Sequence, residues 1–319
     1  MSMTADEFID RRRLRRKLTF WRVVALAVAA IAIVAASWRL FDGQIGGNSS
    51  DHIAKVRIEG TITEDEELLE RLGQIAESER VKGVIIAIDS PGGTTAGGEA
   101  IFEAIREIAA SKPTVAQVGT LAASAGYMVA TATDHIVARQ SSIVGSIGVL
   151  VQFPEFTGLM EKIGIGLEEI KSSPLKAEPS PFNETTEAER AMIRRMILDS
   201  YDWFVDLVTE RRPLERAQVL AVADGSVFTG RQAVENKLVD SLGGEKAALK
   251  WLEEKGLDAE LEVFEWKKKQ EIGLFSPLAS SSLAARLFGV PAANDSLIEE
   301  LGLERIFLDG LVSVWHPKN

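Results

Sequence analysis

The stretch VKGVIIAIDSPGG, residues 81–93, decides the fold of this chain. Its middle, from Val84 to Ile88, is continuously apolar, and it ends in a Ser-Pro-Gly-Gly turn. An apolar run without polar alternation is typical of a strand covered on both faces, as in a parallel sheet. Glycines at the end of such a strand let backbone N–H groups face a ligand, although a tight turn that needs positive φ explains them equally well.

The segments around this strand alternate between strand-like and helix-like patterns. Strands are predicted at residues 52–62, 114–118, 135–138 and 147–153, and helices at 66–77, 99–110 and 185–212. A further short helix and a strand ending near Lys171 precede a segment with three prolines, residues 171–183, which can be neither helix nor central strand. This order predicts an α/β fold, a mostly parallel sheet with crossover helices.

A membrane anchor is predicted at the N-terminus. Residues 11–17 are rich in arginine and lysine, and residues 23–38 carry no charge. We expect a cytoplasmic segment at 1–17, a transmembrane helix at 18–41 and a flexible tether at 42–51 that is rich in Gly, Ser and Asn. Basic residues before the helix place the N-terminus in the cytoplasm and the rest of the chain outside it. A cleaved signal peptide is the alternative.

Composition excludes several classes of function. The net charge of -11 argues against nucleic acid as the main partner, because phosphate binding needs clustered basic residues. The chain has no cysteine, which excludes disulfides, thiolate metal sites and a cysteine nucleophile. An apolar fraction of 46% is sufficient for a folded core in a chain of 319 residues.

A second segment, GTLAASAGY at residues 119–127, places one hydroxyl among very small residues where a strand gives way to a helix. Ser124 is a candidate nucleophile there, and the Ala125 N–H can point toward an oxyanion. An ordinary N-cap serine is the competing interpretation. The carboxyl ends of neighbouring parallel strands meet at one edge, so this segment and the Gly92–Gly93 turn are expected to share one crevice.

A serine nucleophile needs a base, and histidine is a poor candidate in this chain. His52 lies beside the tether, His316 is near the C-terminus, and His135 is expected at the far end of the helix that Ser124 begins. A Ser-His-Asp triad is therefore not predicted. A lysine whose pKa is lowered by burial is an adequate base, and Lys176 in the proline-rich segment is the best candidate.

The chain resembles the SppA-type signal peptide peptidases in their short, single-repeat form. The shared motifs are Ser90-Pro-Gly-Gly93, Ala122-Ala-Ser-Ala-Gly-Tyr127, Gly145-Ser-Ile-Gly-Val149, the Lys176-to-Pro181 loop, Ala223-Asp-Gly-Ser-Val-Phe-Thr-Gly-Arg-Gln-Ala233 and Leu238-Val-Asp-Ser-Leu-Gly-Gly244. They cover a peptidase domain at residues 52–256. No motif covers the C-terminal extension, residues 257–319.

This resemblance implies a crotonase-like or Clp-protease-like fold and an endopeptidase that degrades cleaved signal peptides and other hydrophobic peptides. Ser124 would be the nucleophile and Lys176 the general base, with the Ser146 hydroxyl orienting the lysine amine. Gly92 or Gly93 would join Ala125 in the oxyanion hole. It implies no metal and no cofactor. Two positions depart from many relatives, which have glycine in place of Ala125 and tyrosine in place of Met128.

The resemblance also implies an assembly and a location. Short members form homo-oligomeric rings in which serine and lysine can come from adjacent protomers. The location would be a bacterial inner membrane, crossed once, with the catalytic domain in the periplasm. We add one hypothesis, that Leu121, Tyr127 and Met128 line the substrate pocket.

Two other functions on the same fold stay open. An acyl-CoA-processing enzyme would use paired amides to hold a thioester oxyanion, but a membrane tether and a Ser-Lys pair argue against it. A non-catalytic membrane scaffold would keep the fold and bind membrane-protein segments. Covalent labelling of Ser124 separates a peptidase from a scaffold.

Overall fold

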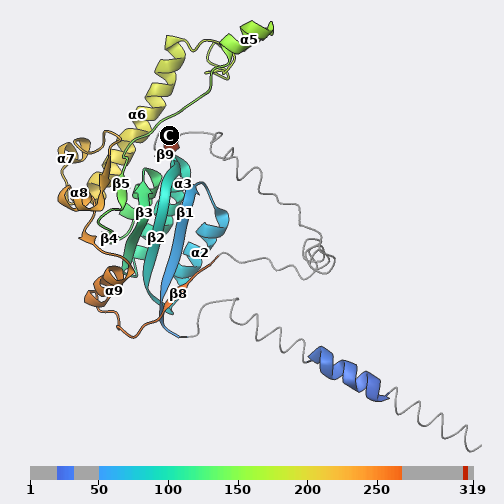
Figure 1. The fold of residues 1–319 in the computed structure, drawn as a ribbon, viewed down its shortest axis with the longest axis vertical. Coiled ribbons are helices and arrows are strands. Elements are labelled where there is room, and N and C mark those ends of the chain that lie inside the picture. The colour runs from blue at the N-terminus through green and yellow to red at the C-terminus, as the bar shows by residue number, and fades with distance from the viewer. Residues whose placement is uncertain (1–19, 32–49, 268–311, 315–319) are drawn as a thin grey trace, which may run out of the picture. The chain divides into compact units, whose positions relative to one another are not determined.

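A computed structural model describes residues 20–31, 50–267 and 312–314 of the chain (Figure 1). The chain divides into two compact units, residues 1–50 and 51–319, and each is described by itself. In the first unit, residues 20–31 form a helix on which Phe20 and Trp21 meet edge to face at 6.1 Å. Within the described ranges, no helix has the length and apolarity needed to cross a membrane. The rest of the predicted anchor, residues 18–19 and 32–41, lies outside them.

The second unit is built on one mixed, mostly parallel sheet, as predicted. The order along its main path is β6-β5-β3-β2-β1-β8, with β4 between β3 and β7 and with β9 beside β2. All pairs are parallel except β5 with β6 and β2 with β9. The strands are β1 His52–Ile62, β2 Val81–Thr94, β3 Thr114–Ala123, β4 His135–Ala138, β5 Ile143–Gly145, β6 Val227–Thr229, β7 Ser241–Leu242, β8 Val263–Glu265 and β9 Val312–Val314.

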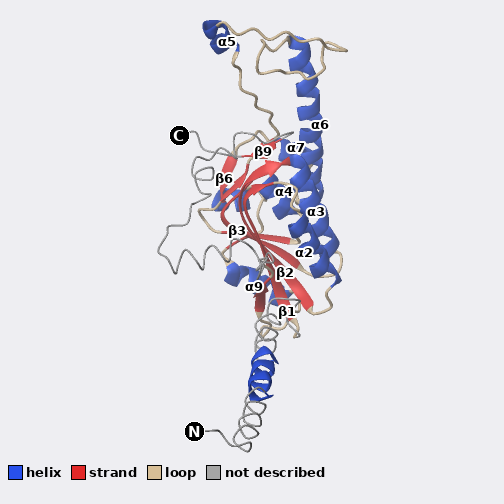
Figure 2. Cartoon of the chain, turned by 90° about the vertical axis from the view of Figure 1, so that its right-hand side faces the viewer, coloured by secondary structure: helices blue, strands red, loops and turns tan. Residues whose placement is uncertain are grey.

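Helices cover both faces of the sheet (Figure 2). They are α2 Glu66–Glu77, α3 Thr95–Ala109, α4 Ala125–Thr131, α5 Thr157–Ile163, α6 Glu187–Arg211, α7 Arg216–Leu220, α8 Gly230–Glu235 and α9 Glu245–Glu254. The larger core joins one face to α2, α3, α4 and the C-terminal part of α6, and a smaller core joins the other face to α9. Ile86 belongs to the first core and Ile85 to the second, because successive strand residues point to opposite faces. Burial on both faces explains the continuous apolar run of β2.

Side-chain caps set the starts of the longer helices. Asp65 accepts a hydrogen bond from the Leu68 N–H at the start of α2, and Thr94 accepts one from Gly97 at the start of α3. Thr186 and Glu189 form a reciprocal capping box at the start of α6. This motif satisfies N–H groups that have no partner inside the helix, so it fixes the first residue of the helix.

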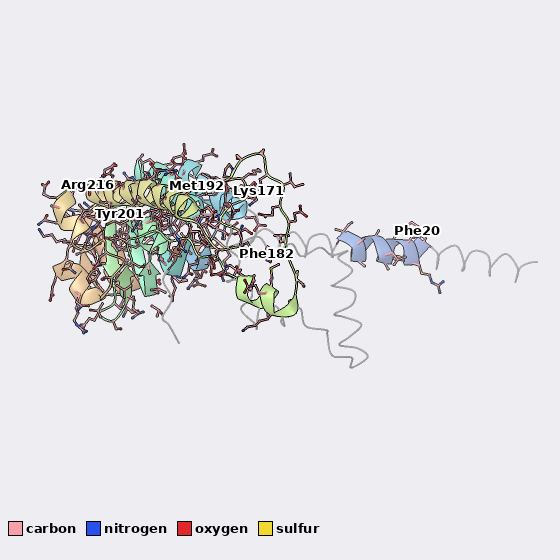
Figure 3. The ribbon with its side chains drawn as sticks, turned by 90° about the horizontal axis from the view of Figure 1, so that it is seen from above. Phe20, Lys171, Phe182, Met192, Tyr201 and Arg216 are labelled. Carbon is pink, nitrogen blue, oxygen red and sulfur yellow. The ribbon has the colours of Figure 1, made fainter. Side chains whose placement is uncertain are left out.

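An arm projects from the sheet between β5 and the middle of α6 (Figures 1 and 2). We define the arm as residues 149–198. It contains α5 and the N-terminal half of α6, and Lys171 and Phe182 lie on it (Figure 3). The predicted strand at 147–153 is wrong, since only Leu150 there forms an isolated bridge, and the strand predicted near Lys171 is also absent from this described stretch. Exposed apolar side chains crowd the arm: Leu150, Phe153, Phe156, Leu159, Ile163, Ile165, Leu167, Ile170, Leu175, Phe182, Met196 and Leu198.

Candidate active site

Ser124 begins α4 in a strained backbone conformation. Its φ is 58° and its ψ is -120°, and its side chain makes no capping hydrogen bond to the helix. The residue is buried, and its N–H donates to the Gly145 carbonyl at 2.8 Å. Positive φ is rare outside glycine and is retained mainly at functional sites, where the surrounding structure holds it. The geometry therefore does not support the interpretation of Ser124 as an ordinary N-cap serine.

The Ser90-to-Gly93 turn touches the start of α4. Ser90 on β2 pairs with Ala122 on β3, two residues before Ser124. A Cβ added to Gly126 would lie 2.9 Å from the Ser90 carbonyl oxygen, a distance that leaves no room for a side chain. The two motifs predicted to share a crevice are thus in van der Waals contact, and the contact requires a glycine at position 126.

Ser146 lies beside Ser124, the predicted nucleophile. Ala123 on β3 pairs with Gly145 on β5, so Ser124 and Ser146 each follow directly after paired residues. Ser146 also has a positive φ, 51°, and its N–H donates to the Ser226 carbonyl at 2.7 Å. The conformation of Ser146 is therefore fixed by β5 and by the segment that leads into β6.

The two glycines predicted for the oxyanion hole, Gly92 and Gly93, differ in their backbone contacts. The Gly92 N–H donates to the Ser90 hydroxyl at 3.1 Å and is occupied inside the turn. Gly93 pairs with Ile62 of β1 and with Ser313 of β9, and a Cβ at position 93 would meet the Ile62 carbonyl oxygen at 1.8 Å. The bond to Ser90 argues against the Gly92 amide as an oxyanion donor, and the Gly93 amide remains the predicted partner of the Ala125 N–H.

Lys176 lies on the arm, where its side chain is exposed, whereas Ser124 is buried at the end of the sheet. One chain by itself therefore does not bury Lys176 in the niche of Ser124. The loop around it is ordered by Glu178, whose carboxylate accepts hydrogen bonds from the Ser180 N–H, the Asn183 amide and the Lys171 ammonium. The Lys171 ammonium holds the pKa of the Glu178 carboxyl below its ordinary value.

Histidine is absent from this edge of the sheet within the described residues. His135 pairs with Val115 at the start of β3, stacks on Trp251 and hydrogen-bonds Ser241. The stretch of β3 from Val115 to Ala123 puts roughly 25 Å between His135 and the start of α4, at about 3.3 Å per residue. His52 lies at the start of β1 against Trp266, and His316 is outside the described residues.

Two of the three predicted pocket residues lie in the core. Tyr127 is fully buried and donates its hydroxyl to the Leu238 carbonyl, and Met128 is fully buried against α3, where its sulfur crowds Gly98. The placement of Tyr127 and Met128 does not fit a substrate pocket. Leu121 is half-buried on β3, three residues before Ser124, and remains a candidate. All seven residues of α4 are buried, so this helix has no exposed face to offer a substrate.

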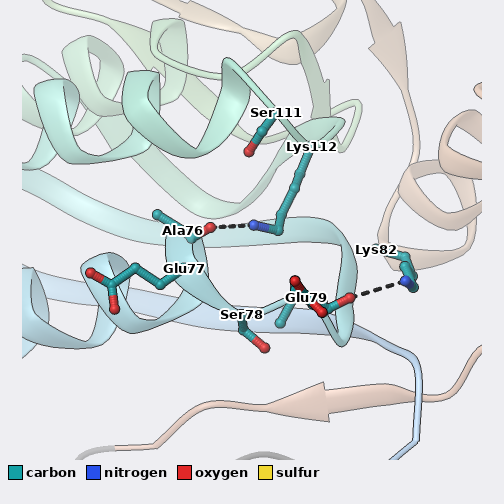
Figure 4. Close-up of a pocket in the computed structure, with 8 residues that line it drawn as sticks. Ala76, Glu77, Ser78, Glu79, Lys82, Ser111 and Lys112 are labelled. Carbon is teal, nitrogen blue, oxygen red and sulfur yellow. Dashed lines mark hydrogen bonds between the residues drawn. The ribbon is translucent and has the colours of Figure 1, made fainter.

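A shallow hollow lies at the opposite end of the sheet (Figure 4). It is formed by the end of α2, the start of β2 and the turn after α3, and Lys112 donates there to the Ala76 carbonyl. Burial lowers the pKa of Lys112. Because it faces the amino ends of the strands, this hollow is separate from Ser124.

Two features of the site were missed from the sequence. Ser90 was treated only as part of a turn, although its buried hydroxyl ties the turn together. β9, in the predicted C-terminal extension, pairs with Gly92–Thr94 and so lies beside the turn of Ser90 to Gly93. The Ser-Pro-Gly-Gly spacing could have indicated the first feature, because serine two residues before a glycine often bonds that residue's N–H. The sequence carries no comparable signal for the second.

Replacing Gly126 with alanine is expected to destabilise the fold by about 1–3 kcal/mol, because the new methyl group must displace the Ser90 turn. A matched control is Gly73→Ala in α2, where a Cβ would meet nothing within 4 Å. Alanine is the better helix former, so that variant should gain up to about 1 kcal/mol. Urea unfolding of both variants measures whether each substitution lowers or raises the free energy of unfolding. Equal stabilisation by the two substitutions would show that α4 does not pack tightly on Ser90.

The fold and site together define a serine hydrolase with a Clp-protease-like architecture. Residues 53–145 match the Clp protease family model, and residues 106–259 match the model of peptidase family S49. A putative protease of Synechocystis is 35% identical over 201 residues, covering 62% of this chain and 72% of that protein. A putative signal peptide peptidase SppA of Enterococcus faecium is 33% identical over 238 residues, covering 69% and 68%. The chain belongs to peptidase family S49, and it is a peptidase.

Other relatives are longer or match in part. A putative protease of Methanocaldococcus jannaschii is 38% identical over 204 residues, 64% of this chain and 66% of that protein. Protease 4 of Haemophilus influenzae is 30% identical over 283 residues, and the match spans 82% of this chain but 46% of Protease 4. The family resemblance seen in the motifs is thus confirmed, and so is the predicted enzyme class.

Proposed function

We propose that the chain is a membrane-anchored serine endopeptidase that degrades cleaved signal peptides and other hydrophobic peptides through Ser124 and Lys176. The observation that carries this proposal is the placement of Ser124. It stands at positive φ at the start of α4, and Gly126, two residues further on in the same helix, packs against Ser90 of the turn that holds Gly92 and Gly93. Similarity to a protein named as a putative signal peptide peptidase supports the substrate class.

In the proposed reaction, the uncharged Lys176 amine takes the proton of the Ser124 hydroxyl as the oxygen attacks the peptide carbonyl carbon. The Ala125 and Gly93 N–H groups donate to the oxyanion that forms. The lysine then gives the proton to the departing amine, which breaks the peptide bond and leaves an ester on Ser124. Water, deprotonated by the same lysine, hydrolyses the ester and restores Ser124. The Ser146 hydroxyl orients the Lys176 amine.

We further propose that the base comes from a neighbouring copy of the chain in a homo-oligomeric ring. Lys176 is exposed on the arm, and burial among apolar groups is what lowers the pKa of a lysine enough for this role. The arm also exposes far more apolar surface than single scattered residues would, and Ile170 is 97% exposed. Such a surface is typical of a protein interface. Packing the arm against a second copy would bury both the apolar surface and the amine.

The strand β9 indicates how a peptide would bind. Val312–Val314 pairs antiparallel with Gly92–Thr94, so this edge of β2 accepts an extended chain next to the Ser124 niche. Main-chain pairing of this kind binds peptides with little dependence on sequence, and pockets for alternate side chains add selectivity. A substrate strand that took the place of β9 would lay its backbone beside the Gly93 amide.

The anchor and the location stay proposals based on the sequence. Residues 18–41 would cross a bacterial inner membrane with residues 1–17 in the cytoplasm and the sheet domain in the periplasm. The helix at residues 20–31 exposes Phe20, Trp21, Val23, Leu26, Val28 and Ile31, side chains that suit a lipid surface.

A comparison of two peptides tests the substrate class. A synthetic peptide with an uninterrupted apolar core should be cleaved with a kcat/KM at least about tenfold above that of a peptide of equal length with lysines in the core. A tenfold difference in kcat/KM corresponds to about 1.4 kcal/mol, and burying one or two apolar side chains supplies a free energy of this size. Equal cleavage of the two peptides, measured by mass spectrometry, would contradict the proposed preference.

A further inference from the structure

Ser90 holds a central position in the site. Its side chain is fully buried, and its hydroxyl donates to the Gly60 carbonyl at 2.7 Å while accepting the Gly92 N–H at 3.1 Å. A serine hydroxyl has one proton to donate and two lone pairs to accept with, so both bonds can form at once. The hydroxyl therefore links β1 to the turn of Ser90 to Gly93, which we call the oxyanion turn.

The link spans an irregularity in the sheet. The pairing of β1 with β2 shifts register between Glu59 and Thr61, and the pairing of β2 with β3 shifts between Ile88 and Ser90. Gly60 and Gly92 both have positive φ, 74° and 108°. Where strands shift register, ladder hydrogen bonds are disrupted and the backbone is aimed in a new direction. At this site, one buried side chain bonds both the Gly60 carbonyl of β1 and the Gly92 N–H of β2.

The consequence concerns the Gly93 amide. The bond from the Gly92 N–H to the Ser90 hydroxyl orients the peptide unit between Pro91 and Gly92, which directly precedes the unit between Gly92 and Gly93. The Gly93 N–H belongs to that unit. On its other side, Ser90 supports α4, since its carbonyl oxygen lies at the van der Waals limit of Gly126. Ser90 thus contacts both backbone segments that carry the proposed oxyanion donors.

We propose that Ser90 is a positioning residue that holds the Gly93 and Ala125 amides in register for the oxyanion. This inference rests on the proposed function. Oxyanion donors act only when they are aimed at the transition-state oxygen, and losing one such donor costs about 10²–10³ in kcat. Loosening one donor by removing the Ser90 hydroxyl should therefore lower kcat with little change in KM.

The chain offers a matched control in Ser142. It is also buried, its hydroxyl donates to the Gly119 carbonyl at 2.6 Å, and it accepts the Arg139 N–H at 3.0 Å. Ser90→Ala and Ser142→Ala remove the same two kinds of bond from buried turns of the same sheet. Only the first removes them from the oxyanion turn.

The test uses full-length protein and two inhibitors. A peptide aldehyde forms a hemiacetal with the nucleophile, whose oxygen occupies the oxyanion hole, whereas the matching peptide alcohol binds without forming an oxyanion. For Ser90→Ala we expect kcat to fall about 10- to 100-fold and the aldehyde inhibition constant to rise by a similar factor, with KM and the alcohol inhibition constant within about twofold of the parent values. Ser142→Ala should change none of the four by more than about threefold. Ser90→Cys, which keeps the volume and a weaker donor, should lie between Ser90→Ala and the parent enzyme.

The outcomes separate this inference from the function on which it depends. If Ser90→Ala weakens the aldehyde and the alcohol equally, or behaves like Ser142→Ala, Ser90 has only a structural role and the inference is overturned. If Ser124→Ala retains the parent activity, the proposed function itself fails. If circular dichroism shows that Ser90→Ala does not fold, the test uses Ser90→Cys instead. Its kcat, its KM and its two inhibition constants are then measured, and parent values for all four would overturn the inference.

Discussion

Replacing Ser124 with alanine is expected to lower kcat for peptide hydrolysis by roughly 10⁴-fold or more, the scale seen when a nucleophile is removed. The reason is chemical, because no acyl-enzyme ester can form without the hydroxyl oxygen. The backbone should not change, since alanine meets the same φ of 58° as serine and the side chain makes no capping bond that would be lost. Initial rates on an apolar peptide measure the effect, and thermal unfolding checks that the fold is retained.

Ser146→Ala is a second variant whose residual activity can be compared with that of Ser124→Ala. Ser146 follows the residue paired with Ala123 and is proposed only to orient the lysine, so its loss should reduce kcat less severely than the loss of Ser124. If Ser124→Ala and Ser146→Ala kept similar residual activity, the nucleophile would have to be sought elsewhere at the end of the sheet.

Replacing Lys176 with alanine should abolish turnover while leaving the stability of the isolated chain unchanged. Its side chain is exposed on the arm, and surface substitutions of this kind usually change the free energy of unfolding by no more than about 0.5 kcal/mol. Peptide cleavage by Lys176→Ala measures its turnover, and urea unfolding of the same variant measures its stability. Parent-rate cleavage would show that another group is the base.

Mixing two inactive variants tests where the lysine comes from. If Ser124 and Lys176 act from adjacent copies, then Ser124→Ala and Lys176→Ala chains, unfolded together and reassembled at equal ratio, should recover about a quarter of the parent activity, because a quarter of the neighbouring pairs combine an intact serine with an intact lysine. Each variant reassembled alone is the control. If the mixture is inactive although the variants coassemble, both residues must come from one chain.

The central sheet could be predicted because its signals are local. The strands at 52–62 and 135–138 and the helix at 66–77 are confirmed at both ends. Each is a short apolar pattern bounded by turn or capping residues such as Asp65, which mark boundaries without reference to distant segments. The helix predicted at 185–212 begins two residues later, at Glu187, because Thr186 and Glu189 form the capping box there.

The arm could not be predicted for a physical reason. Residues 147–153 are apolar like a strand, but a strand needs a neighbour to pair with, and β5 already takes its place at Ile143–Gly145 beside β3. The apolar side chains of the arm are exposed in the single chain, and the proposed pairing with a second copy would have no local pattern in the sequence. Tyr127 and Met128 were misplaced because the direction of a short helix is set by packing against α3 and α6.

The backbone conformation and hydrogen bonds of the site could not be predicted from the sequence either. That Ser124 has a positive φ, that Gly92 bonds Ser90, and that β9 runs along Gly92–Thr94 all depend on how three segments distant in the chain meet. The motifs indicated which residues gather at this edge. The structure adds that the Gly92 N–H is occupied by Ser90 within the turn.

Mapping the adduct of a fluorophosphonate on the full-length protein tests the central claim most directly. The probe reacts with an activated serine, and peptide mass spectrometry locates it. The account predicts a single adduct on Ser124 that disappears in Ser124→Ala and forms far more slowly in Lys176→Ala. An adduct on a different residue, or labelling that persists in Ser124→Ala, would contradict it.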